Sequence, residues 1–143
     1  MQKRFKVFLD TSAIIAGLNS PTGAAGVLVS FCMTGNIEAI ISTQVIEEAE
    51  RNITKKFPRL LPAWQSFLLI PPTVTSNPTI RQIRIARKLI PTDDAPILAS
   101  ALKARPDAFV TWNTRDFMRP GLEKNLPFAV FTPGDFLKRF RAH

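Results

Sequence analysis

The sequence lacks most of the side chains on which the common hydrolytic mechanisms depend. Its one histidine is the last of 143 residues, His143, and it has no tyrosine. A histidine general base, a Ser-His-Asp or Cys-His arrangement and a histidine-rich zinc site are therefore disfavoured. The chain also has neither a GxxxxGK(S/T) phosphate loop nor a GxGxxG turn after its first predicted strand. Carboxylates are the main catalytic groups that remain.

Cysteine and long apolar runs are also scarce. The single cysteine, Cys32, can form no internal disulfide, and its apolar setting VLVSFCM predicts a small core residue. No run approaches the roughly 18 apolar residues that a membrane-spanning helix needs. The N-terminal sequence MQKRFKVFLD has no secretory signal pattern. We therefore expect a cytoplasmic protein that does not associate with membranes.

Acidic residues are few relative to basic ones. Nineteen lysines and arginines against eleven aspartates and glutamates give a net charge of +8 and a pI near 10.4. Such an excess attracts the phosphate backbone of nucleic acids, whatever their sequence. The alternatives are an acidic protein partner, or no particular partner at all. Apolar residues make up 45% of the chain, which is ordinary for a globular protein.

Short apolar runs alternate with longer amphipathic segments along the chain. We expect strands at residues 5–9, 37–41, 72–75, 107–111 and 127–131. We expect helices at residues 13–18, 23–34, 43–57, 60–69, 78–90, 93 or 94–104 and 133–140. Trp64 is predicted to be a core residue, and Ile80 is predicted to lie on the apolar stripe of its helix. The alternation predicts one α/β domain over residues 1–143, a sandwich with helices on both faces of a mostly parallel sheet.

Four acidic residues lie at or shortly after the ends of predicted strands, or at the start of a helix. They are Asp10 in KVFLD, Glu48 in the helix after EAII, Asp94 at the start of DAPILASAL and Asp116 in FVTWNTRDF. Side chains at the carboxyl ends of parallel strands converge on one crevice. Four carboxylates would repel one another there unless a divalent cation neutralised them. The pattern therefore indicates a metal site, and a metal held by carboxylates suits phosphodiester hydrolysis.

Each of these residues also has a purely structural interpretation. Asp10 could cap a helix, and Asp94 could stabilise the first turn of its helix through the backbone dipole. Asn113 is a residue type that is common in turns. Glu47 and Glu48 are about equally far from the apolar stripe of their helix, so spacing alone does not choose between them.

The phrases VFLDTSAIIAGL, ISTQVIEEAER, DDAPILASAL and FVTWNTRDF, in this order, resemble the motifs of PIN domains. These are compact metal-dependent nucleases, and they include the VapC-type toxins of prokaryotic toxin–antitoxin pairs. The resemblance extends from Val7 to about Phe117. It matches the four acids of the family with Asp10, Glu48, Asp94 and Asp116. It also matches Asn113 with a position that is often Asp or Asn, and Thr11 and Thr111 with hydroxyl neighbours of the site. Ser12, close to Asp10 in the sequence, is a further hydroxyl residue that could steer a water or a phosphate.

The resemblance implies an α/β/α sandwich with a central, mostly parallel five-stranded sheet. It implies an endoribonuclease whose catalytic residues are the four acids, with Asp10, Asp94 and Asp116 as ligands of Mg²⁺ or Mn²⁺. Hydrolysis would leave a 5′-phosphate on the cleaved strand. The implied partners are RNA, a cognate antitoxin and a second copy of the chain in a homodimer. The alternative is a domain of the same fold that binds nucleic acid or a partner protein and has little catalytic activity.

Basic and aromatic residues are candidates for RNA contacts. Arg81, Arg84 and Lys88 recur at helical spacing and could form one basic face. Trp112 could stack on a base, or it could be buried against the sheet edge. Two other basic clusters, within residues 51–59 and 138–141, could bind RNA or could be solvated surfaces.

Overall fold

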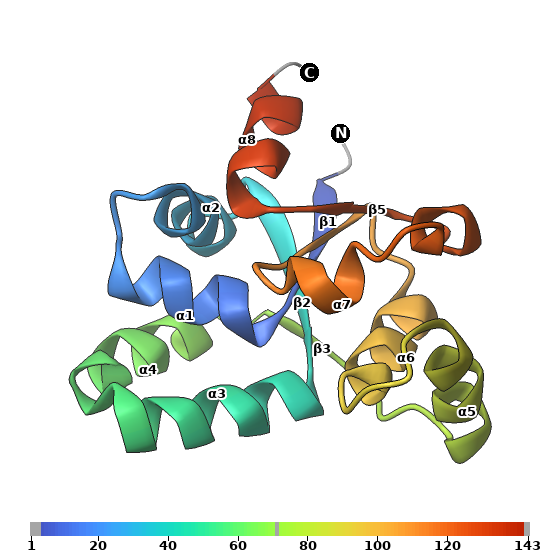
Figure 1. Cartoon of the computed structure of the whole chain (residues 1–143). Helices are drawn as coiled ribbons and strands as arrows, with labels where there is room; N and C mark the ends of the chain where they lie inside the picture. The colour runs from blue at the N-terminus through green and yellow to red at the C-terminus, as the bar shows by residue number, and fades with distance from the viewer. Residues whose placement is uncertain (1–3, 71, 142–143) are drawn as a thin grey trace.

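Five parallel strands form one sheet in the computed structural model, which describes residues 4–70 and 72–141 (Figure 1). The strands are β1 Phe5–Leu9, β2 Ile37–Ser42, β3 Thr73–Thr75, β4 Ala108–Val110 and β5 Ala129–Phe131. Their order is β3-β2-β1-β4-β5, and every neighbouring pair is parallel. The predicted five-stranded parallel sheet is confirmed. His143 lies outside the described residues.

β1 lies at the centre of the sheet because its side chains are apolar on both faces. Val7, Phe8 and Leu9 are fully buried, as expected for a parallel strand between two layers of helices. β4 is equally apolar, and the rings of Phe8 and Phe109 stack with their centroids 5.2 Å apart. The edge strand β3 is short and mostly exposed. The segments that follow β1 and β4 therefore leave the sheet side by side, at its carboxyl edge.

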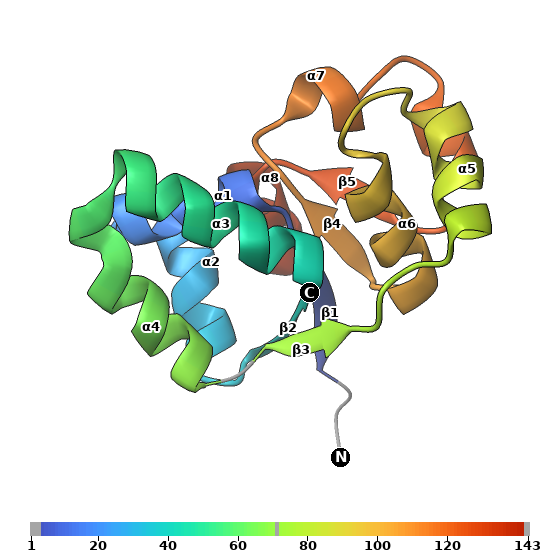
Figure 2. The same cartoon turned by 90° about the horizontal axis from the view of Figure 1, so that it is seen from below.

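Helices cover both faces of the sheet. They are α1 Thr11–Asn19, α2 Ala24–Met33, α3 Thr43–Lys56, α4 Leu61–Leu69, α5 Ile80–Leu89, α6 Ala95–Ala104, α7 Thr114–Phe117 and α8 Pro133–Arg141. Figures 1 and 2 show α1 to α4 on one side and α5 and α6 on the other, while α8 packs against α2. The fold is thus the predicted three-layer α/β/α sandwich.

No single helix in the described part of the chain has the length and apolar content for a membrane span. α1 and α2 reach that length only as a pair bent by 99°.

Most predicted core residues are buried, but one is not. Trp64 is 1% exposed and stacks on Phe67, with ring centroids 5.9 Å apart. Cys32 is partly buried against the core, and burial raises the pKa of its thiol to about 12. Ile80, however, is 71% exposed. It lies in the first turn of α5, whereas the buried contact of that helix is centred on Ala86.

Three short elements were not predicted, namely α7 and the 3₁₀ turns at Pro58–Leu60 and Leu122–Asn125. Each is only three or four residues long, and a segment this short carries no helical periodicity that a sequence pattern could reveal. The structure resolves the predicted turn at Asn113 into the N-cap of α7.

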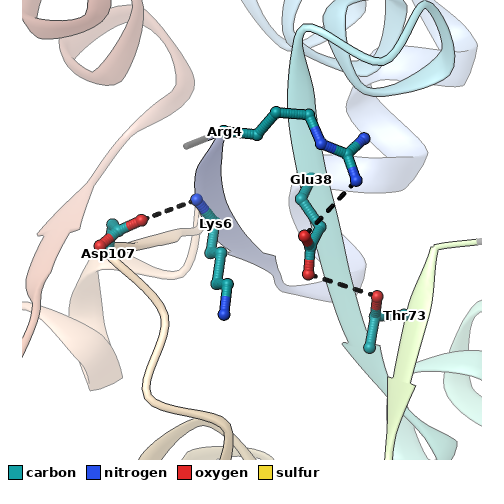
Figure 3. A network of polar contacts seen from close by, with 5 residues as sticks. All are labelled: Arg4, Lys6, Glu38, Thr73 and Asp107. Atoms are coloured by element: carbon teal, nitrogen blue, oxygen red, sulfur yellow. Dashed lines mark hydrogen bonds and ion pairs between the residues drawn. The ribbon is translucent and has the colours of Figure 1, made fainter. Parts of the chain in front are cut away.

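Polar contacts join the starts of four strands at the edge of the sheet that lies away from their carboxyl ends (Figure 3). Arg4 pairs with Glu38 at 3.6 Å, and the hydroxyl of Thr73 donates to the same carboxylate at 3.5 Å. The backbone amide of Lys6 donates to Asp107 Oδ2 at 2.8 Å. These groups are largely exposed, so each contact adds little stability. They hold the register of the sheet rather than build a site.

Candidate active site

Asp10 is held at the point where β1 gives way to α1. Its backbone amide donates to the carbonyl of Val110 at 3.0 Å, and its own carbonyl accepts from the amides of Ala13 and Ile14. Its side chain makes no capping bond to α1. The capping interpretation of this carboxylate is therefore wrong, because the side chain turns instead toward the end of β4.

Two hydroxyls bind one oxygen of the Asp10 carboxylate. Thr111 Oγ1 donates to Asp10 Oδ2 at 2.7 Å, and Ser12 Oγ donates to the same atom at 3.1 Å. The hydroxyls are fixed in turn by the backbone amides of Asn113, at 2.8 Å, and Trp112, at 2.9 Å. Burial raises the pKa of Asp10, although these hydrogen bonds act in the opposite direction. The side chain is 4% exposed, so its orientation is tightly defined.

Asn113 joins two further acids. Its side-chain amide donates to Asp94 Oδ2 at 2.8 Å and to Asp116 Oδ2 at 3.1 Å. Its Oδ1 accepts from the backbone amide of Asp116 at 3.3 Å, which caps α7. Sequence reasoning treated Asn113 as a neighbour of the site and did not foresee this bridging role. The spacing N-x-x-D, typical of a helix start, was the signal that could have revealed it.

The fold disfavours the ionised form of Asp94. It is the N-cap of α6 but makes no side-chain capping bond. Burial raises its pKa to about 7, together with hydrogen bonding to Asp116 and repulsion from Asp10, Glu48 and Asp116. Near neutral pH this carboxyl therefore holds a proton part of the time. Asp94 thus does not cap α6 through its side chain, which accepts a hydrogen bond from Asn113 instead.

Glu48 joins the group from α3. Ser42 starts that helix by accepting a hydrogen bond from the amide of Val45 at 3.2 Å. Burial raises the pKa of Glu48, the negative charge of Asp10 raises it further, and Arg51 opposes both effects. Glu47 is exposed. The helix therefore directs Glu48 toward Asp10, a choice that helical spacing left open.

Four acids from four separate segments thus act on one another electrostatically. We refer to Asp10, Glu48, Asp94 and Asp116 as the acidic cluster. The family model described as PIN domain matches residues 6–115, which is most of the chain and includes three of these acids. The chain belongs to the PIN domain family. No curated protein sequence matches it.

Solved structures share the fold of this PIN domain at low sequence identity. PAE2754 from Pyrobaculum aerophilum has a TM-score of 0.68 at 13% identity, and the match covers 99% of this chain and 100% of that one. DNA-bound VapBC from Salmonella typhimurium has a TM-score of 0.64 at 23% identity, covering 90% and 98%. VapBC2 from Rickettsia felis, bound to a promoter DNA fragment, has a TM-score of 0.60 at 15% identity, covering 90% and 98%. At these identities the likeness establishes the fold.

The donor atoms of the acidic cluster fit a hard divalent cation. They are carboxylate oxygens, which Mg²⁺ and Mn²⁺ prefer, and a cation would relieve the repulsion that raises the pKa of Asp94. Within residues 4–70 and 72–141, however, no three acidic, histidine or cysteine side chains are arranged to chelate an ion on their own. Since Mg²⁺ keeps several of its waters, the arrangement fits an ion that is bound partly through water.

Thr11 differs from the other two hydroxyl residues that were predicted near the site. Its backbone amide hydrogen-bonds the Asp10 carboxylate. Its side-chain hydroxyl is buried and has no hydrogen-bond partner in the described part of the chain. Ser12 and Thr111 are therefore the hydroxyls that contact the carboxylate of Asp10.

The residues predicted to contact RNA lie on the surface. Arg81, Arg84 and Lys88 are all exposed on α5. Trp112 is 48% exposed, between Thr111 and Asn113 of the site network. Full burial of this indole against the sheet edge is therefore wrong, while stacking on a base stays a prediction.

Proposed function

We propose that this PIN domain is a metal-dependent endoribonuclease and the toxin of a toxin–antitoxin pair. The observation that carries the proposal is the acidic cluster. Burial of Asp94, its hydrogen bond with Asp116 and repulsion from the other three acids together raise its pKa to about 7. A domain that only binds a partner gains nothing from such repulsion, whereas phosphodiester hydrolysis uses carboxylates to bind a divalent cation.

In this proposal Asp10, Asp94 and Asp116 are the ligands of Mg²⁺ or Mn²⁺, and Glu48 completes the catalytic set. When bound, the cation would stabilise charge on the scissile phosphate and lower the pKa of an attacking water. The resemblance to the family implies in-line attack that leaves a 5′-phosphate.

The chain's own residues prepare the carboxylates for this role. Thr111 and Ser12 hold Oδ2 of Asp10, so the carboxylate keeps one orientation. The side-chain amide of Asn113 donates hydrogen bonds to both Asp94 and Asp116, which holds the two carboxylates close together. Asp94 has to release its proton before it binds a cation, because metal ligands must be deprotonated. Binding of the metal and ionisation of Asp94 are therefore coupled.

RNA is the substrate that the remaining surface favours. The net charge of +8 attracts a polyanion. The half-exposed indole of Trp112 offers a stacking platform one residue away from Thr111. Arg81, Arg84 and Lys88 add exposed positive charge on α5.

Cleavage of a mixed-sequence RNA by the purified protein tests the proposal. The reaction is run with Mg²⁺, with Mn²⁺ and with EDTA, for the wild type, Asp94→Asn and Asp93→Asn. Asp93 is the matched control, because it is the exposed neighbour of Asp94 and makes none of the described hydrogen bonds. We expect cleavage that requires a metal, disappears in Asp94→Asn and persists in Asp93→Asn.

The opposite result would favour the binding domain. If no metal supports cleavage while the wild type still shifts RNA in a gel, the protein binds RNA without catalysis. Equal activity of the wild type and Asp94→Asn would exclude the acidic cluster as the active site.

An apolar groove is the surface that we propose for the antitoxin. It has a volume of about 670 Å³ and lies among α1, α2 and α4, with Leu18, Val29, Met33 and Ile70 in its lining. Ile70 is 52% exposed. An amphipathic segment of the antitoxin would cover these side chains, as helices commonly dock in apolar grooves.

Co-expression with the product of the adjacent reading frame tests this contact. Ile70→Asp should prevent co-purification, whereas Leu61→Asp should not, because Leu61 is exposed at the start of α4, outside the groove, while Ile70 follows the end of that helix. Equal binding by both variants would move the antitoxin to another surface. We also propose that the toxin is a homodimer in the cytoplasm, and light scattering on the purified protein measures its mass.

A further inference from the structure

A second concave site lies close to the acidic cluster, where residues at the end of α5 meet residues of the segment beyond α7. This cavity of about 320 Å³ is lined by Lys88, Pro91, Arg119, Gly121 and Asn125, among others. Pro91 precedes Asp94 by three residues, and Arg119 follows Asp116 by three. Each pair of Cα atoms is therefore at most about 11 Å apart. We call this cavity the basic pocket.

Two positive charges face the basic pocket without a negative partner. No aspartate or glutamate lines it. Among the described residues, neither Lys88 nor Arg119 makes a side-chain hydrogen bond or an ion pair. The ion pair found there joins Arg4 to Glu38, at another edge of the molecule. Lys88 is exposed, so repulsion between the two cations costs little in water. An anion in the pocket would nevertheless interact favourably with both.

A rigid turn holds the arginine in place. The amide of Leu122 donates to the carbonyl of Arg119 at 3.0 Å, which closes a four-residue turn. Pro120 and Gly121 occupy its centre, and Gly121 has φ 82° and ψ −9°. These values and this Pro-Gly order are those of a type II turn, which needs glycine at its third position. The backbone that carries Arg119 is therefore fixed before any ligand arrives.

We propose that Lys88 and Arg119 together hold one backbone phosphate of single-stranded RNA, close to the linkage that the acidic cluster cleaves. A guanidinium can bind two phosphate oxygens at once, and an ammonium adds a flexible point charge. The inference rests on the proposed function and names the residues that position its substrate. The predicted basic face joined Lys88 to Arg81 and Arg84. The pocket instead pairs Lys88 with Arg119 and includes neither of those two arginines.

Binding measurements with a short single-stranded RNA test the proposal. They use the Asp94→Asn background, so that bound RNA is not cut, and compare Lys88→Gln/Arg119→Gln with Lys138→Gln/Arg139→Gln. The second pair removes the same charge from exposed positions on α8. Loss of one phosphate contact should reduce the salt dependence of binding by about 0.7 in log–log slope. We expect weaker binding and this smaller slope only in the pocket variant.

Kinetics in the active protein provide the second measurement. The pocket variant should raise KM and leave kcat unchanged, since it removes a contact that is equal in the ground state and the transition state. The single variant Lys88→Gln, at an exposed position, repeats the test should the double variant fold poorly. Equal losses of affinity and of salt slope in the pocket and α8 variants would overturn the proposal, because the pocket would then contribute no more than an exposed basic pair elsewhere on the surface. A fall in kcat at constant KM would overturn it as well.

These outcomes separate the pocket from the proposed function. If the wild type cleaves RNA and the pocket variant behaves like the α8 control, only the pocket assignment fails. If the wild type binds RNA without cleaving it and the pocket variant binds more weakly, the assignment stands and the ribonuclease proposal fails. If the wild type neither cleaves nor binds RNA, both fail.

Discussion

Replacing Asp94 with asparagine should make the protein more stable in EDTA, by an amount that grows as the pH rises from about 4 and is complete above about pH 7. The pKa of Asp94 rises from 3.8 to about 7 in the fold, chiefly through burial and then through neighbouring acids. About three pKa units correspond to about 4 kcal/mol. Because the side chain is partly exposed, screening by solvent reduces this to about 1–2 kcal/mol.

The sign follows from the proton that the folded protein retains. Between the unfolded pKa of 3.8 and the folded pKa of about 7, the native state binds more protons than the unfolded state, so stability falls as pH rises. Below pH 3.8 the wild type keeps all of the stability that the protonated Asp94 carboxyl contributes, and above about pH 7 it has lost that stability. Asparagine cannot ionise, and its oxygen can still accept the hydrogen bond from Asn113.

Urea denaturation in EDTA, followed by circular dichroism, measures the effect at about pH 4.5 and at about pH 8. We expect Asp94→Asn to exceed the wild type by about 1–2 kcal/mol at the higher pH and by much less at the lower. Asp93→Asn should match the wild type at both, since Asp93 is exposed and makes none of the described hydrogen bonds. A gain of equal size at both pH values, or a loss at pH 8, would refute the reasoning and return Asp94 to a structural role.

Three further predictions concern residues around the acidic cluster. Thr111→Val should destabilise the fold by about 1–3 kcal/mol in urea titrations, because the buried Asp10 carboxylate loses its 2.7 Å donor; the exposed Thr114→Val should cost much less. Trp112→Ala should weaken RNA binding in a gel shift by about 1–3 kcal/mol and leave the melting temperature unchanged, and a large drop in that temperature would assign Trp112 to packing. Gly121→Ala should cost about 1 kcal/mol in thermal melts because φ is 82°. Gly134→Ala, where a Cβ meets only the methyl of Ala24 at 4.0 Å, should be neutral or stabilising, and equal effects at the two glycines would contradict the strain argument.

Much of the fold could be predicted from local patterns. Buried strands such as β1 are short and continuously apolar, and the residues between them have helical periodicity or turn residues. The alternation of strands and helices then leaves few arrangements other than a parallel sheet between helical layers. Exposure of Ile80 was missed because the pattern of a single helix cannot tell where its neighbour ends. α7 was missed because four residues carry no period.

The candidate site, like the fold, could be predicted only in part from the sequence. The sequence by itself predicted a set of four acids, three of them at or shortly after strand ends, since the position of a residue along a parallel strand decides the edge at which it emerges. Only the tertiary structure decided that Glu48 and not Glu47 acts with Asp10, that Asn113 bridges two carboxylates, and that Lys88 shares a pocket with Arg119. These relations join segments far apart in the chain, and their geometry depends on how helices pack on the sheet. No periodicity within one segment records that packing.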